Sequence, residues 1–166
     1  MMRTRRLLCA SLLALAIGTG ATTAEERSIA GSFELDAVEF YKVQVDADDP
    51  YHLAVLTRQV GKNESTGPHA FMPGADVTVT NASDEKGTAF TQHGYAEFRD
   101  TDGVALFEFT GEGTSRIDGD QVTFTGKGTW ELTKATGSYE GKAGSGTLTF
   151  NGSPENSVVH WQGSLQ

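Results

Sequence analysis

The stretch from Gly126 to Phe150 reads GKGTWELTKATGSYEGKAGSGTLTF and is the strongest indication of the fold in this chain. Glycines recur in it between large apolar side chains, and in strands such glycines mark bulges, sharp bends or close approach of a backbone or ligand. A sheet that closes into a small barrel needs these bends. The stretch therefore predicts an antiparallel barrel with an interior. Its glycines are Gly126, Gly128, Gly137, Gly141, Gly144 and Gly146, and its large apolar residues are Trp130, Tyr139, Leu148 and Phe150.

The rest of the chain has the same character. Apolar residues recur with period two from Gly31 onward, as in half-buried strands, and Asp102-Gly103 and Asp118-Gly119 are hairpin signals. With no long amphipathic helix, the pattern predicts an all-β fold, a single closed antiparallel barrel of about eight strands. The expected strand segments are 31–45, 51–60, 75–80, 88–99, 104–110, one ending near Arg116, one holding Val122 and Phe124, 126–132, 144–150 and 157–165.

Three segments are expected to lie outside the strands. Residues 61–74, GKNESTGPHAFMPG, contain two prolines and three glycines and are expected to form a long loop. Loops of this length in compact domains are often lids or binding loops. Residues 25–30 are the linker candidate, and residues 138–141 are expected to make a short helical turn.

The first 24 residues have the order of a secretory signal peptide. Three arginines precede an apolar run of about eleven residues, shorter than the ~20 that a membrane span needs, and a small-residue stretch ends at Ala24. We predict a signal peptide over 1–24, cleaved near Ala24, and a secreted or periplasmic barrel domain over 25–166 that is not inserted in a membrane. An uncleaved interfacial anchor is the alternative.

Composition argues against several kinds of site and partner. Cleavage would remove three of the 13 basic residues and none of the 22 acidic ones, which leaves a net charge of −12. Such a chain repels nucleic acid and anionic membranes. Cys9, the only cysteine, lies in the signal segment, so the mature chain has no disulfide, zinc–thiolate site or cysteine nucleophile. No two of the four histidines stand at metal-ligand spacing, and we predict neither a metal nor a cofactor.

Several short segments resemble sequence motifs of the allene oxide cyclase-like barrels. They are GTWEL (128–132), TGSYEG (136–141), GSGT (144–147) and, earlier in the chain, QHGY (92–95). That group includes the plant dirigent proteins and small secreted bacterial proteins of unknown function, which this chain resembles most. The resemblance implies an eight-stranded barrel, often trimeric, whose interior holds a small apolar or aromatic molecule. Confinement does most of the work in the plant members, and we carry no plant catalytic residue over to a position in this sequence.

The strand 88–99 contains two catalytic candidates. His93 and Tyr95 share one face, and Phe90 and Phe98 lie on the other. The aromatic face is the better core, so His93 is expected to point outward; a bulge at Gly94 would reverse this direction. An inward His93 would be a general base or a hydrogen-bond donor to a ligand.

Glu108 is the third catalytic candidate, because a carboxylate between apolar neighbours can serve as an acid. Strand alternation instead places it on the solvent face. Trp161 is expected in the core and His160 outside, because Val159 and Leu165 lie on the same face as Trp161. The candidate ligand contacts are His93, Phe107, Phe109, Trp130 and Trp161.

Three functions remain open, in this order. The first is a barrel that binds a small apolar or aromatic ligand. The second is a cofactor-free isomerase or cyclase that confines a reactive molecule, which requires at least two of His93, Tyr95 and Glu108 to converge within an apolar pocket. The third is a self-associating structural protein of the envelope, which exposed apolar patches on the barrel would support.

Overall fold

The described part of the chain is almost entirely β-structure. The computed structural model describes residues 26–166, and the predicted signal peptide lies outside them. Eight antiparallel strands form one sheet, which confirms the all-β prediction, and one 3-10 helix, η1 (Gly137–Tyr139), lies where the short helical turn was expected. The strands are β1 (Arg27–Asp46), β2 (Asp49–Glu64), β3 (Asp76–Lys86), β4 (Ala89–Arg99), β5 (Val104–Asp118), β6 (Gln121–Ala135), β7 (Gly144–Gly152) and β8 (Asn156–Leu165).

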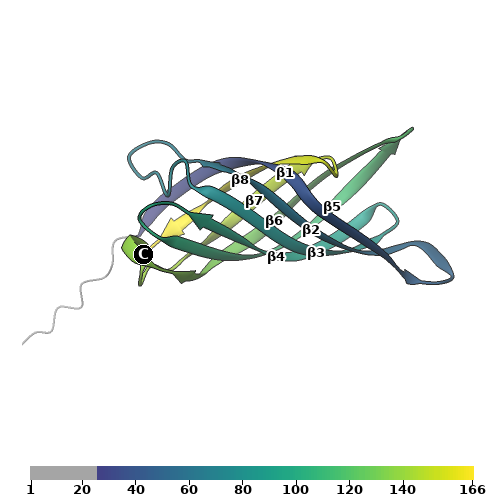
Figure 1. The fold of residues 1–166 in the computed structure, drawn as a ribbon, viewed down its shortest axis with the longest axis horizontal. Coiled ribbons are helices and arrows are strands. Elements are labelled where there is room, and N and C mark those ends of the chain that lie inside the picture. The colour runs from purple at the N-terminus through teal and green to yellow at the C-terminus, as the bar shows by residue number, and fades with distance from the viewer. Residues whose placement is uncertain (1–25) are drawn as a thin grey trace, which may run out of the picture.

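The sheet closes into a barrel because β1 pairs with both β2 and β8. Every other strand pairs with its two neighbours in sequence. The strands are strongly tilted (Figure 1): following paired residues once around the sheet from Phe33 of β1 leads back to β1 at Gln44, eleven residues further along. Tilt and stagger of this kind give an eight-stranded barrel an interior that side chains fill or that one small ligand occupies.

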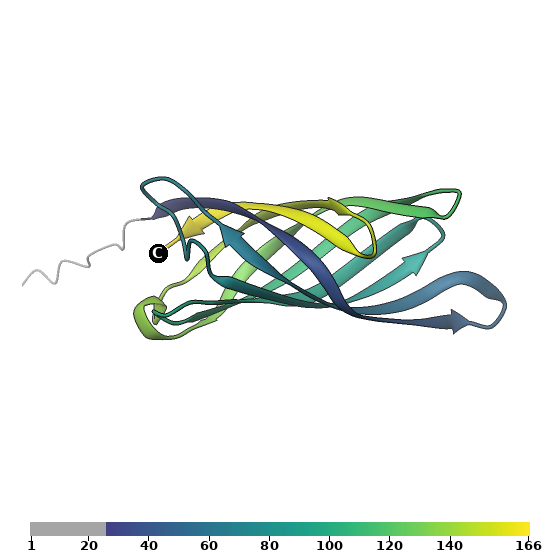
Figure 2. The ribbon, with the colours of Figure 1, turned by 45° about the horizontal axis from the view of Figure 1, so that its top comes forward.

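The two ends of the barrel differ in their connections (Figures 1 and 2). The loop end holds the start of β1, the end of β8 and the connections 65–75, 100–103 and 136–143. The hairpin end holds the short turns that join β1 to β2, β3 to β4, β5 to β6 and β7 to β8. The β1–β2 and β5–β6 hairpins extend furthest at that end (Figure 1). Among residues 26–166 no helix is long and apolar enough to cross a membrane.

Strands β5 and β6 are longer than predicted, since each runs unbroken through the glycines at which separate segments were expected. Gly113 and Gly126 lie opposite each other in the ladder. A Cβ on Gly113 would stand 2.5 Å from Cζ of Phe90, and one on Gly126 would collide with the ring of Phe150. These glycines therefore make room for inward aromatic rings and do not end a strand.

Strands β1 and β2 also exceed their predicted bounds. The expected linker is largely strand, because β1 begins at Arg27 and its first residues pair with the last residues of β8. The expected loop begins after Glu64 rather than after Val60, because the end of β2 pairs with β1 and with the start of β3. An available partner strand overrides the local composition at both places.

The core fills the loop-end half of the barrel. Its rings contact one another in a chain, with centroids 4.9 Å apart for Phe98 and Phe107, 5.4 Å for Phe107 and Trp130, and 6.3 Å for Trp130 and Trp161. Phe90 and Phe98 both point inward, as predicted, and so does Trp161. Loop 65–75 adds buried side chains of its own, which close this end.

Candidate functional site

The candidate site is a cavity of about 200 Å³ inside the barrel. It extends from the aromatic core to the hairpin end, where Phe40 remains 46% exposed. Every strand contributes inward residues to it, because side chains that face the interior alternate with exposed ones along each strand. The cavity is therefore a product of the whole sheet and not of one loop.

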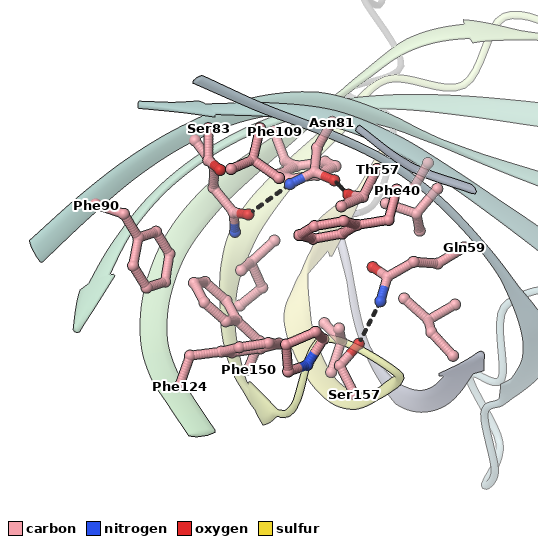
Figure 3. A pocket seen from close by; sticks show the side chains of 18 of the residues that line it. Phe40, Thr57, Gln59, Asn81, Ser83, Phe90, Phe109, Phe124, Phe150 and Ser157 are labelled. Carbon is pink, nitrogen blue, oxygen red and sulfur yellow. Dashed lines mark hydrogen bonds between the residues drawn. The ribbon is translucent and has the colours of Figure 1, made fainter. Parts of the chain in front are cut away.

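One wall of the cavity near its mouth is aromatic (Figure 3). Phe90, Phe124 and Phe150 come from β4, β6 and β7, and their ring centroids lie 6.1–6.3 Å apart. Phe90 and Phe124 are only half-buried although they face inward. These rings present apolar surface to the cavity without closing it.

A chain of hydrogen-bonded polar side chains adjoins the aromatic wall: it runs from Gln92, the next inward residue of β4 after Phe90, across β3 to β2 (Figure 3). The hydroxyl of Thr57 donates to the side-chain oxygen Oδ1 of Asn81, and Nδ2 of Asn81 donates to Oε1 of Gln92 over 2.8 Å. Because Gln92 accepts through its oxygen, its two amide N–H groups take no part in that bond. Gln59 donates to Oγ of Ser157 over 3.2 Å on the same side. This polar arc gives the cavity a defined place for one polar group of a ligand.

Gly94 makes room for part of the polar arc. It is buried opposite Asn81, and a Cβ there would stand 2.6 Å from Cβ of Asn81. The β3–β4 ladder passes Gly94 without a register shift, so the bulge that would have turned His93 inward is absent from this ladder.

The mouth of the cavity is lined by two charged side chains of opposite sign, Lys42 of β1 and Glu85 of β3. They are the titratable groups among the residues that line the described cavity. The turn between β7 and β8 contributes Pro154 to the same rim. A ligand that enters from solvent passes these groups before it reaches the apolar interior.

The loop end is closed by hydrogen bonds to loop 65–75. Asn63, which is 1% exposed, donates through Nδ2 to the carbonyl oxygens of Phe71 (2.8 Å) and Met72 (2.9 Å), and its Oδ1 accepts from Nε1 of Trp161 (3.2 Å). Ser65 donates to the carbonyl oxygen of Ala30 over 2.6 Å. These bonds hold Phe71 and Met72 in the barrel as a plug, so the predicted long loop closes the end opposite to the mouth.

Tyr139 also stabilises the closed loop end, because it packs against the plug residue Phe71. Its ring lies 5.4 Å from that of Phe71, and its hydroxyl donates to Oδ2 of Asp100 over 2.6 Å. Burial, and then the hydrogen bond to Asp100, raises the pKa of Tyr139 well above its ordinary value. The phenol therefore stays protonated as a donor over the physiological pH range.

The three catalytic candidates lie on the outer surface and do not line the cavity. Nε2 of His93 stands 2.7 Å from Oε1 of Glu108, and the His93 and Tyr95 rings make an edge contact with centroids 5.5 Å apart. The side chains of His93 and Glu108 are 50% and 41% exposed. The outward direction predicted for His93 is therefore confirmed. The three converge, but on a solvated face, so the convergence within an apolar pocket that a cyclase required is not found.

The aromatic ligand candidates fare differently from His93. Phe107, Phe109, Trp130 and Trp161 all line the cavity, where they form its floor and part of its walls. His93 does not line the cavity, so it is no longer a candidate for contact with a ligand there.

The polar arc and the buried Asn63 were not predicted from the sequence. A signal existed for Gln92, which shares the inward face with Phe90 and Phe98. Asn63 lay in a segment interpreted as loop, where a polar residue carries no such signal. Among the described residues no group of three or more His, Cys, Asp and Glu side chains is arranged to hold a metal ion.

Comparison with protein-family models and with curated proteins finds no match for this sequence.

Proposed function

We propose that the protein binds a small apolar or aromatic molecule in the barrel cavity. The observation that carries the proposal is the pairing of an aromatic wall with a polar arc in one open interior. Burial of apolar ligand surface supplies the affinity, and a few placed polar groups fix orientation, as in most small-molecule sites.

The cavity limits the size of the ligand. Pockets for drug-sized ligands start at about 300 Å³, and an apolar cavity of about 150 Å³ holds benzene. A volume of about 200 Å³ therefore suits a molecule of one or two rings, with more of it reaching into the open mouth. The Gln92 amide favours a ligand whose ring carries a hydroxyl or carbonyl oxygen, because its N–H groups would donate to that oxygen.

An uncharged fluorescent probe, N-phenyl-1-naphthylamine, tests the proposal directly, because its two-ring naphthyl group matches the cavity and its phenyl group would extend into the open mouth. We expect its emission to rise and saturate with the chain from Glu25 to Gln166. Ser115→Trp places an indole in the mouth and should abolish the rise, because Ser115 lines the cavity. Thr114→Trp is the matched control, since the preceding residue of β5 is exposed on the outer face. Equal binding by both variants would rule out the cavity as the site.

The polar arc is tested by comparing two ligands of one shape. 1-Naphthol should bind about 3- to 10-fold more tightly than naphthalene, which corresponds to one net neutral hydrogen bond. Gln92→Leu should remove that difference and retain naphthalene binding. If the preference survives in Gln92→Leu, the amide is not the recognising group.

An isomerase or cyclase function receives less support. The catalytic candidates His93, Tyr95 and Glu108 lie outside, and the titratable groups along the cavity are at its mouth. Binding therefore remains the first proposal and confinement catalysis the second.

We also propose that the protein is exported and that cleavage near Ala24 leaves the barrel domain in the periplasm or medium. Mass spectrometry of the exported chain should give the mass of residues 25–166. Retention of the full-length chain in the cell membrane would contradict this proposal.

A further inference from the structure

Exposed apolar side chains gather at the hairpin end of the barrel. Among residues 26–166, the large hydrophobic residues of high exposure include seven on the β1–β2 hairpin, one (Ile117) near the tip of the β5–β6 hairpin, and Tyr95 elsewhere. A cluster of this kind on a soluble surface usually marks an interaction site. The seven are Val38, Phe40, Tyr41, Val43, Val45, Tyr51 and Leu56.

Strand β1 has a free edge at the same place. Strand β8 pairs with β1 only as far as Asp36, and the N–H of Ala37 donates to the carbonyl oxygen of Glu155 over 2.8 Å. Among residues 26–166, β2 alone pairs with the segment from Glu39 to Gln44, and register shifts leave Val38 and Val45 at its two ends without a cross-strand partner. Such an edge presents unpaired N–H and C=O groups and is a template for another strand.

We propose that this edge pairs with the same edge of a second copy of the chain, antiparallel and with Tyr41 opposite Tyr41. The two copies would be related by a two-fold axis perpendicular to the paired strands. Such an axis keeps the outer faces of both barrels on the same side, so outward residues lie opposite outward residues only. Centring on Lys42 would oppose two ammonium groups. Centring on Tyr41 instead places Lys42 of one copy opposite Phe40 of the other, which is a favourable cation–π pairing.

The proposed register continues the apolar surface across the junction. Tyr41 already pairs with Leu56 of β2, and Glu39 pairs with Arg58. The two hairpins would form a four-stranded ribbon with a row of Leu56, Tyr41, Tyr41 and Leu56 across it. Tyr41 and Leu56 are 61% and 55% exposed, so the row is available in the single chain.

Charge favours a second copy over a lipid surface. The edge from Val38 to Val45 carries one acidic and one basic side chain, Glu39 and Lys42, and is neutral in a strongly acidic protein. Two such edges do not repel locally. End-on insertion into a membrane would instead dehydrate the carboxylates of Asp46, Asp48 and Asp49 at the hairpin tip, at high cost.

Disulfide trapping tests the register, because the chain from Glu25 onward has no cysteine. Opposed residues of an antiparallel pair have Cα atoms about 4.5–5.5 Å apart, within disulfide range. Tyr41→Cys should therefore oxidise to a covalent dimer. Val45→Cys should not, since the two Val45 positions would lie eight residues apart along the ribbon, or about 26 Å. Ile117→Cys controls for random collision.

Sedimentation velocity of the unmodified chain gives an independent readout. We expect a concentration-dependent dimer whose dissociation constant rises about ten-fold or more in Val43→Glu, because Val43 would lie opposite Glu39 of the other copy and a second carboxylate there replaces apolar contact with like-charge repulsion. Ile117→Glu should leave it unchanged; Val43 and Ile117 are 63% and 65% exposed, so the two variants are matched. A monomer or a trimer, or equal trapping of Tyr41→Cys and Val45→Cys, would overturn the proposal whatever the cavity binds.

Discussion

The loop end and the hairpin end are built from the same eight strands, yet only the loop end is filled. Loop 65–75 carries Phe71 and Met72 into the barrel, and Asn63 bonds to both of their carbonyl groups. The hairpin end has short turns that bring few side chains inward. The connections, more than the strands, therefore decide whether such a barrel holds a packed core or a cavity.

The largest expected effect is a difference in the free energy of unfolding between two variants, one without an aromatic ring at the loop end and one without a ring at the hairpin end. Trp161→Ala should lower the free energy of unfolding by about 3–5 kcal/mol, because a buried indole and its contacts with Phe98 and Trp130 are lost. Phe124→Ala at the mouth should cost only about 1–2 kcal/mol, because that ring is half-buried. Guanidinium unfolding measures both. Equal losses would mean that the hairpin end is as tightly packed as the loop end.

The next effect concerns the two asparagines that face the interior. Asn63→Leu should cost about 3 kcal/mol, because the indole N–H of Trp161 and the carbonyl oxygen of Phe71 would be buried without partners, while the carbonyl oxygen of Met72 keeps its bond from the N–H of Ala75. Asn81→Leu should cost about 1 kcal/mol, because water in the open cavity can satisfy the groups it leaves. Urea unfolding of the pair decides. A larger loss from Asn81→Leu would reverse the assignment of the closed and open ends.

Much of the fold is predictable from local signals, and these examples show why. The alternation along β4 places Phe90 and Phe98 inside, and Val159 and Leu165 identify Trp161 as inward. The role of each glycine is not local. Gly126 accommodates the ring of Phe150, which is its direct partner in the β6–β7 ladder but lies 24 residues further along the sequence. A pattern of glycines predicts curvature without saying which ones end a strand.

The site is less predictable than the fold for a related reason. Aromatic residues on an inward face mark the cavity, so Phe107, Phe109, Trp130 and Trp161 could be found in advance. Gln59 and Asn81 point inward because of the register of their strands in the closed sheet. Where both faces of a strand are polar, alternation along the sequence does not distinguish the inner face from the outer one. His93 drew attention by its chemistry, but its face is solvated.

A smaller effect is expected from the fastening of the plug by Tyr139. Tyr139→Phe should cost about 1.5 kcal/mol at pH 7, because the hydroxyl donates to the Asp100 carboxylate. The pKa of Tyr139 is raised on folding, so this group's contribution is complete below about pH 10, the ordinary tyrosine pKa, and is lost as pH rises toward its folded value. The difference between wild type and variant should therefore shrink above about pH 10. Urea unfolding from pH 7 to 11 measures it, and a difference that grows with pH would contradict the bond.

The smallest effect is expected at the exposed group of His93, Tyr95 and Glu108 on the outer surface of the barrel. His93→Ala should change the free energy of unfolding by less than about 0.5 kcal/mol, because its contact with Glu108 joins two exposed side chains and such surface contacts contribute little. Binding of N-phenyl-1-naphthylamine should be unchanged, since His93 does not line the cavity. Glu108→Gln is the companion variant and should behave alike. A loss of probe binding in either would show that the outer face communicates with the interior, and would return the cluster to the candidate site.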